Sequence, residues 1–144
     1  MRADYLNVNS QQTGSYKKKT LLVNADITLT EADSGKVMFL DAAAGTVAVT
    51  LPTATTGEDG VYYQFIVWEE TPSNAITVAA GSAIVSMVMK DAGGNASNST
   101  VGTQVSNIVI GTSAQKGDYI NIMAAGDEWV AECLSSIDDA VTTS

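Results

Sequence analysis

The chain has no histidine and a single cysteine, Cys133, among its 144 residues. Without histidine it has no imidazole base for a Ser-His-Asp or Cys-His relay and no imidazole ligand for a metal ion. One cysteine excludes an internal disulfide and a zinc site built from several thiolates. We therefore predict a protein that is not an enzyme and that has no catalytic residues, no metal ligands and no cofactor.

Basic residues and long apolar runs are scarce as well. Seven Lys and Arg face sixteen Asp and Glu, for a net charge of −9, and an acidic protein repels the phosphates of nucleic acids. No apolar run approaches the roughly 20 residues of a membrane-spanning helix. The first residues lack the basic and apolar regions of a secretory signal. We expect no nucleic-acid partner, no membrane partner and synthesis in the cytoplasm.

Four of the seven basic residues stand near the amino terminus. Residues 1–22 carry a net charge of +3, whereas the rest of the chain has three lysines and fifteen carboxylates. The first 20 or so residues are polar and show neither helical nor strand periodicity, which is typical of an extended or disordered segment. We predict an N-terminal arm over 1–22, a β-domain over 23–135 and a flexible polar tail over 136–144.

The rest of the sequence consists of short segments rich in Val, Ile, Thr and aromatic residues, separated by Gly, Asp, Asn and Ser. Such segments are typical of strands and turns. The predicted strands are 27–29, 36–40, 46–51, 61–69, 75–79, 83–89, 104–110, 118–123 and 128–134. No amphipathic helix separates them. This spacing predicts an all-β fold, a single antiparallel β-sandwich, jelly-roll-like or barrel-like domain with an extended N-terminal arm.

The segment 61–69 carries large apolar side chains on both of its faces. Residues 63, 65 and 67 would share one face and residues 62, 66 and 68 the other, because side chains alternate along a strand. A core needs only one of these faces, so the other predicts a contact with a partner chain. Alternation alone does not indicate which of the two faces contacts the partner chain. The predicted interface residues are Tyr62, Tyr63, Phe65, Ile66, Val67 and Trp68.

Five further segments stand in a definite order along the chain. They are LTEADSGKVMFLD (29–41), VAVTLP (47–52), GVYYQFI (60–66), GDYI (117–120) and GDEW (126–129). Together they resemble a β-module of tailed-bacteriophage virion proteins, which occurs in capsid decoration (cement) proteins and in head or tail fibre proteins. Each segment alone is common in β proteins, whereas the ordered set is not.

The resemblance implies a structural virion protein on the outer surface of the capsid. A decoration protein binds and bridges subunits of the major capsid protein, assembles as a homotrimer and stabilises the shell. The interface of that trimer would come from segment 61–69. One short domain with an arm favours this role, because a fibre needs a shaft or a receptor-binding tip. A head or tail fibre subunit is the alternative within the virion class.

The arm supplies the predicted contact with the major capsid protein. An extended segment can add a strand to the edge of a partner's sheet, and lysines speed the encounter with an acidic surface. The arm combines a small apolar cluster with a lysine triplet. The predicted capsid-binding residues are Tyr5, Leu6, Val8, Tyr16, Lys17, Lys18 and Lys19.

A carbohydrate-binding β-sandwich module is the alternative from a different class. Such a module stacks sugars on exposed aromatic rings, and Trp68 and Trp129 are the candidates. Aromatic residues more often fill a core or a subunit interface. The exposure of the two indole rings therefore separates the two readings.

Overall fold

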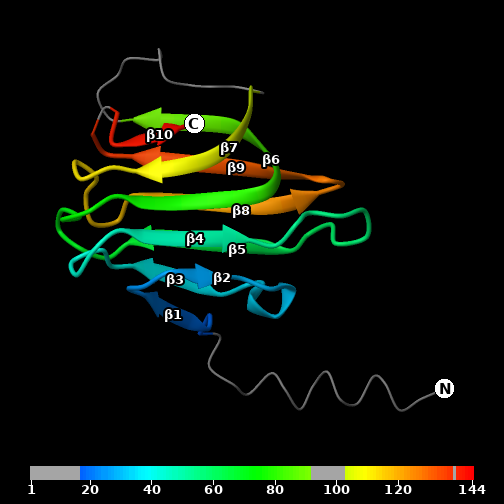
Figure 1. Cartoon of the computed structure of the whole chain (residues 1–144), viewed down its shortest axis with the longest axis horizontal. Helices are drawn as coiled ribbons and strands as arrows, with labels where there is room; N and C mark the ends of the chain where they lie inside the picture. Colours follow the sequence, from blue (N-terminus) through cyan, green and yellow to red (C-terminus); the bar gives the residue numbers. More distant parts are fainter. Residues whose placement is uncertain (1–16, 92–102, 138) are drawn as a thin grey trace.

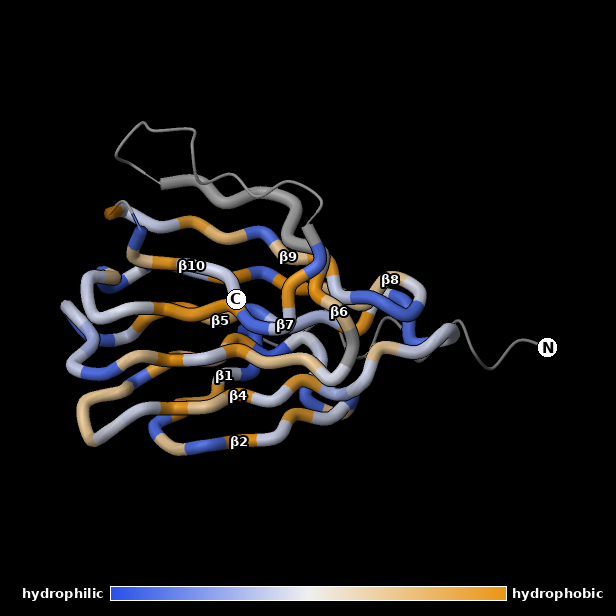
Figure 2. Tube along the Cα trace, turned by 45° about the horizontal axis from the view of Figure 1, so that its top comes forward, coloured by the Kyte–Doolittle hydropathy of each residue, from blue (hydrophilic) through white to orange (hydrophobic). Residues whose placement is uncertain are grey.

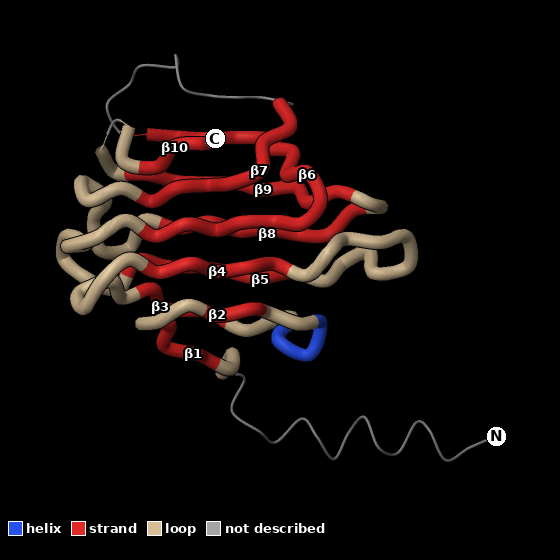
Figure 3. The backbone as a smooth tube through the Cα atoms, in the orientation of Figure 1, coloured by secondary structure: helices blue, strands red, loops and turns tan. Residues whose placement is uncertain are grey.

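The computed structural model describes residues 17–91, 103–137 and 139–144, which form ten strands and one turn of 3-10 helix (Figures 1 and 3). This confirms the all-β class. Residues Tyr5, Leu6, Val8 and Tyr16 of the predicted arm lie outside the described residues. The elements are β1 (Thr20–Val23), β2 (Ile27–Thr28), η1 (Glu31–Asp33), β3 (Val37–Leu40), β4 (Val47–Leu51), β5 (Tyr62–Val67), β6 (Ile76–Asp91), β7 (Thr103–Ile110), β8 (Tyr119–Ala125), β9 (Glu128–Ser135) and β10 (Val141–Thr143).

The strands form one sheet that folds over on itself into a nearly closed, barrel-like arrangement. Its order is β1-β3-β5-β8-β9-β6-β4-β2, with β7 beside β6 and β10 beside β7. The fold-over occurs in β6, whose first half pairs with β4 and whose second half pairs with β9. Its pairing with β7 shifts register between Ala79 and Ile84. A bent strand of this kind turns the corner between two packed layers.

Successive strands of the first half of the chain alternate between the two layers. Strands β1, β3 and β5 pair in parallel in one layer, and β2, β4 and the start of β6 pair in parallel in the other. The antiparallel arrangement predicted from the sequence is therefore wrong for this half, although β7, β8, β9 and β10 do form antiparallel pairs. Parallel strands need a crossover, usually a helix. Here a strand of the opposite layer serves as the crossover, so the lack of helices did not exclude parallel pairing.

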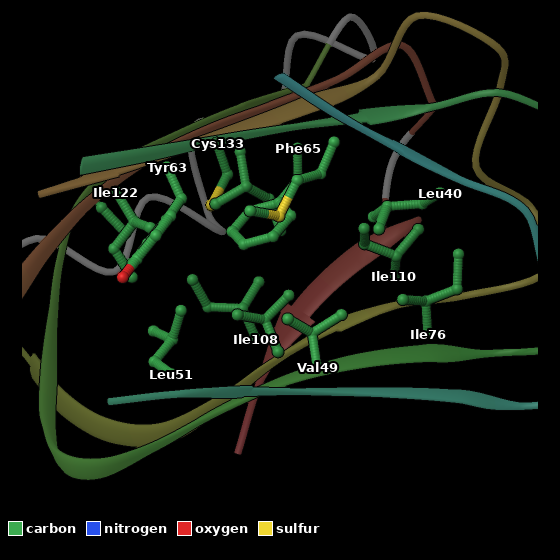
Figure 4. Close-up of a cluster of buried hydrophobic side chains, with 14 of the residues drawn as sticks. Leu40, Val49, Leu51, Tyr63, Phe65, Ile76, Ile108, Ile110, Ile122 and Cys133 are labelled. Carbon is green, nitrogen blue, oxygen red and sulfur yellow. The ribbon is translucent and has the colours of Figure 1, made fainter. Parts of the chain in front are cut away.

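The core lies between the inner faces of the two layers. Figure 4 shows Tyr63, Phe65 and Cys133 from one layer pointing toward Val49 and Ile108 from the other, and all five are buried. Figure 2 shows the alternation of apolar and polar positions along the strands that makes this possible. Strand β4 is the clearest case, because its residues alternate strictly between buried and exposed.

Two polar side-chain atoms in the core find backbone partners. The Tyr63 hydroxyl donates a hydrogen bond to the Thr30 carbonyl oxygen at 2.9 Å, and the Trp129 indole N–H donates to the Pro52 carbonyl oxygen at 3.1 Å. The two rings also pack together, with centroids 5.7 Å apart. Large aromatic residues can therefore be buried without an unsatisfied donor.

Both ends of the predicted β-domain need correction. Strand β1 includes residues 20–22 of the predicted arm and pairs with β3. The predicted flexible tail contains β10, which pairs with β7, and Val141 within it is 4% exposed. Val-Thr-Thr is too short to show alternation, so its strand character comes from the neighbouring edge of β7. The predicted strands 75–79 and 83–89 are two parts of the bent strand β6.

Substitutions in β4 test the inward and outward alternation. Val49 is fully buried and Thr50 is exposed. Val49→Thr places a hydroxyl in the core and should lower the free energy of unfolding by about 1–3 kcal/mol. Thr50→Val changes the same two groups on the outer face and should stay within about 0.5 kcal/mol of the wild type. Urea unfolding of both variants measures the difference, and equal losses would contradict this placement of β4.

Candidate interaction face

The outer face of the layer formed by β1, β3, β5, β8 and β9 carries large apolar side chains. Of the six large apolar side chains that the described residues leave exposed, five lie here: Leu22, Tyr62, Trp68, Met123 and Leu134. Single exposed apolar residues are ordinary on a protein surface, but a contiguous group marks an interaction site. We call this outer surface the apolar face.

Strand pairing arranges the apolar face in rows that cross the strands. One row crosses all five strands, because its members are register partners of one another. It consists of Leu22, Phe39, Ile66, Tyr119 and Leu134. The Trp68 ring packs against Phe39 at a centroid distance of 4.9 Å, and the Lys116 ammonium lies 4.8 Å from the centroid of the Trp68 ring. These two contacts hold the exposed indole in place.

A groove of about 530 Å³ lies at the other end of the same face, over β5, β8 and β9. Tyr62, Met123 and Val130 form one row of its lining, and Gln64, Asn121 and Glu132 form the next. The Lys18 ammonium reaches the groove and donates to the Gln64 side-chain oxygen at 3.3 Å. The groove thus combines an apolar row with a row of hydrogen-bonding groups.

Carboxylates are rare on the apolar face. Among the described outward residues of its strands only Glu128 and Glu132, both on β9, carry one. The Gln104 amide donates to Glu128, whereas Glu132 has no hydrogen bond or ion pair with any described residue. Since the whole chain has sixteen Asp and Glu, most of the negative charge lies elsewhere.

The outer face of the opposite layer has a different composition. Its outward positions on β2, β4, β6, β7 and β10 alternate with buried residues of the core. Those described outside the bend of β6 are small or polar with one exception: Thr28, Ala48, Thr50, Thr77, Ala79, Asn107 and Thr142, with Val109 as the exception. The two outer faces of the domain therefore differ: one carries large apolar side chains, and the other carries mostly small or polar ones.

The six predicted interface residues divide between the two faces of β5. Tyr63, Phe65 and Val67 are at most 1% exposed and belong to the core, so they are not available to a partner chain. This corrects their assignment. Burial and nearby carboxylates raise the pKa of Tyr63 to about 12. Tyr62, Ile66 and Trp68 point outward and form part of the apolar face.

The remaining predicted residues also have defined positions. Lys17, Lys18 and Lys19 are exposed where the chain enters β1. Cys133 is buried, and burial raises the pKa of its thiol to about 12, which keeps it protonated at neutral pH. Trp129 is 1% exposed and cannot stack a sugar. Only Trp68 of the two indoles reaches the surface, and Phe39 and Lys116 already contact it.

Several residues of the apolar face were not found from the sequence. Leu22, Phe39 and Lys116 lie in three separate segments. Only tertiary structure brings Phe39 and Lys116 to Trp68 and Leu22 to Phe39. Alternation did offer a signal within single strands. On β8, Tyr119 and Met123 alternate with the buried Ile120 and Ile122, so their side chains lie on the outer face of the strand.

Comparison with models of known protein families and with curated proteins finds no match for the chain. Among the described residues, no group of three or more His, Cys, Asp or Glu side chains is placed to hold a metal ion. The described part of the chain also contains no helix with the length and apolar character needed to cross a bilayer.

Two pairs of carboxyl groups lie at strand ends. Glu31 and Glu58 share a hydrogen bond, which raises the pKa of Glu31 and lowers the pKa of Glu58. The other pair is Asp41 and Glu69. Burial, followed by the hydrogen bond with Asp41, raises the pKa of Glu69. The pKa of Asp41 is lowered, mainly by the hydrogen bond from the Ala43 backbone N–H and to a smaller extent by the one with Glu69. One oxygen of Glu69 is buried without a hydrogen-bond donor. Protonation of Glu69 would let this carboxyl group donate a hydrogen bond to Asp41.

The pair predicts a pH-dependent stability. Because the pKa of Glu69 is raised above its ordinary 4.5, its contribution to stability is present below that pH and is lost as the pH rises. In Glu69→Gln an uncharged amide donates to Asp41 at every pH. We expect its melting temperature to exceed that of the wild type by about 2 °C at about pH 7.5, with a smaller difference at about pH 4. Glu70→Gln, next to it and exposed, is the control. A gain in Glu69→Gln that is independent of pH would contradict the shared proton.

Proposed function

We propose that this chain is a capsid decoration protein of a tailed bacteriophage. It would bind the outer surface of the head, bridge subunits of the major capsid protein and stabilise the shell as a homotrimer. The resemblance of segments 29–41, 47–52, 60–66, 117–120 and 126–129 to the virion β-module motivates the class. The contrast between the apolar face and the opposite outer face of the domain supports this role.

The two outer faces differ in the free energy that is lost when they are exposed to water. Covering apolar area is worth about 25 cal/mol per Å² removed from water. Five large side chains on one face gain from being covered, whereas the small, threonine-rich side chains of the opposite face do not require it. A subunit of a larger assembly that keeps one side in water has this distribution. An isolated soluble domain gains nothing from it.

In this proposal the arm provides a second contact with the major capsid protein. Residues 1–22 carry a net charge of +3 and the rest of the chain is strongly acidic. In the proposal the segment before β1 adds a strand to a sheet edge of the major capsid protein, and Lys17, Lys18 and Lys19 speed its approach to an acidic shell. Salt should weaken this attraction, because the three lysines are exposed.

Capsids assembled with and without the chain test the role in the shell. Decorated capsids should retain their contents to a higher temperature and resist a chelator better, because a bridging subunit must be removed before neighbouring capsid subunits separate. Heating followed by a nuclease-protection assay measures the retained DNA. Equal resistance of the two kinds of particle would overturn the cement role.

The copy number per virion separates decoration from a fibre. Hundreds of copies are expected for a decoration protein, and quantitative mass spectrometry of purified particles against the major capsid protein counts them. A handful of copies would favour the head or tail fibre subunit instead.

Deletion of residues 1–16 tests the arm. All described strands begin after this segment, the first being β1 at Thr20, so we expect the truncated domain to fold with an unchanged circular dichroism spectrum. We also expect it to lose attachment to capsids in a cosedimentation assay. Lys17→Ala, Lys18→Ala and Lys19→Ala together should instead weaken attachment and reduce its dependence on salt. Full occupancy by the truncated chain would place the anchor in the β-domain.

A further inference from the structure

The apolar face carries a projecting side chain at one end and a groove at the other. Trp68 is 46% exposed, is held by Phe39 and lies beside the Lys116 ammonium. The groove opens between the row of Tyr62 and the row of Glu132. We call Trp68 with Lys116 the knob. We infer that the knob of one copy enters the groove of a second copy of this chain.

Trp68 cannot reach the groove of its own chain. Tyr62 and Trp68 are six residues apart on an extended strand, which corresponds to roughly 20 Å. The indole is also fixed against Phe39 on the neighbouring strand β3. A Trp68 side chain seated in the groove must therefore belong to a second copy of the chain.

Knob and groove are complementary in chemistry. An indole presents a large apolar surface, which suits the row of Tyr62, Met123 and Val130. Its N–H makes no hydrogen bond with a described residue, and a buried indole N–H usually finds an acceptor. The Asn121 amide oxygen and the Glu132 carboxylate in the groove are acceptors. Tryptophan is also enriched among the pocket-filling residues that contribute most of the binding energy in protein interfaces.

Knob and groove are complementary in charge as well. Lys116 accompanies Trp68, and Glu132, which lines the groove, has no ion-pair partner among the described residues. Seating the knob would bring this ammonium and this carboxylate together. Two copies of a chain with net charge −9 repel each other. They approach best through a face on which carboxylates are rare.

The face is also large enough for such a contact. Five strands about 4.8 Å apart give a width of about 24 Å, and strands of six to eight residues give a length of about 20 to 27 Å. Two such faces bury on the order of 1,000 Å², the lower range of specific interfaces. Because the knob and the groove are different patches, repeated contacts form a ring where the rotation between copies closes and an open filament where it does not. That such a ring would contain three subunits rests on the proposed function.

Sedimentation of the full chain at micromolar concentrations tests the inference without any capsid. We expect the wild type to associate, and Trp68→Ala, Lys116→Glu and Glu132→Lys each to weaken association about tenfold or more. The double variant Lys116→Glu/Glu132→Lys restores the opposite charges with exchanged signs and should associate more tightly than either single variant. Thr50→Lys, an exposed change on the opposite face, is the matched control and should associate like the wild type.

Two results would overturn the inference. One is a wild-type chain that stays monomeric throughout this range, and the other is association that the Trp68 and charge variants leave unchanged. Circular dichroism confirms that each variant is folded, which is expected because all three side chains are exposed. The capsid experiments remain a separate test, since a chain can associate without decorating capsids and can decorate them without associating.

Discussion

The packing of two inner faces against each other is the constraint on which the rest of the structure depends. Because the chain passes from one layer to the other between successive early strands, neither layer can bury its apolar row alone. Val49 from one layer and Phe65 from the other meet in the same core (Figure 4). Side chains alternate strictly along a strand, so an inward Phe65 forces Ile66 and Trp68 outward. The apolar face is thus a geometric consequence of the core.

Electrostatics then favour contact through an outer face of the domain over contact through the strand ends. Carboxyl groups gather at strand ends, where two pairs lie close enough to share hydrogen bonds. Such pairs oppose ionisation of both members at once. The apolar face lacks this crowding and carries a lysine at each end, Lys18 by the groove and Lys116 by Trp68. Two copies of an acidic protein therefore meet less repulsion through this face than at the strand ends.

Much of the fold could be predicted from the sequence, because alternation and turn residues act within short segments. Nearly all the strands were placed this way, including the strongly alternating β4. Strand direction was not predicted, since it depends on which distant segments pair. Strands β1 and β10 were missed, because Thr20–Val23 and Val141–Thr143 are too short to show a period of their own. The same division holds for the site. Outward Tyr62, Ile66 and Trp68 could be named as one face of a strand, whereas Phe39 and Lys116 join Trp68 only through tertiary structure.

The entry of the chain into β1 links the arm to the apolar face. Lys18 precedes β1 and donates to Gln64 on β5, so this last part of the arm already lies along the rim of the groove. The Lys19 carbonyl oxygen accepts a hydrogen bond from the Val37 backbone N–H at 2.9 Å, which fixes this path against β3. In the proposed assembly the arm and the groove therefore act from the same side of the domain. The threonine-rich layer, on the opposite side, is left facing water, as its small polar side chains allow.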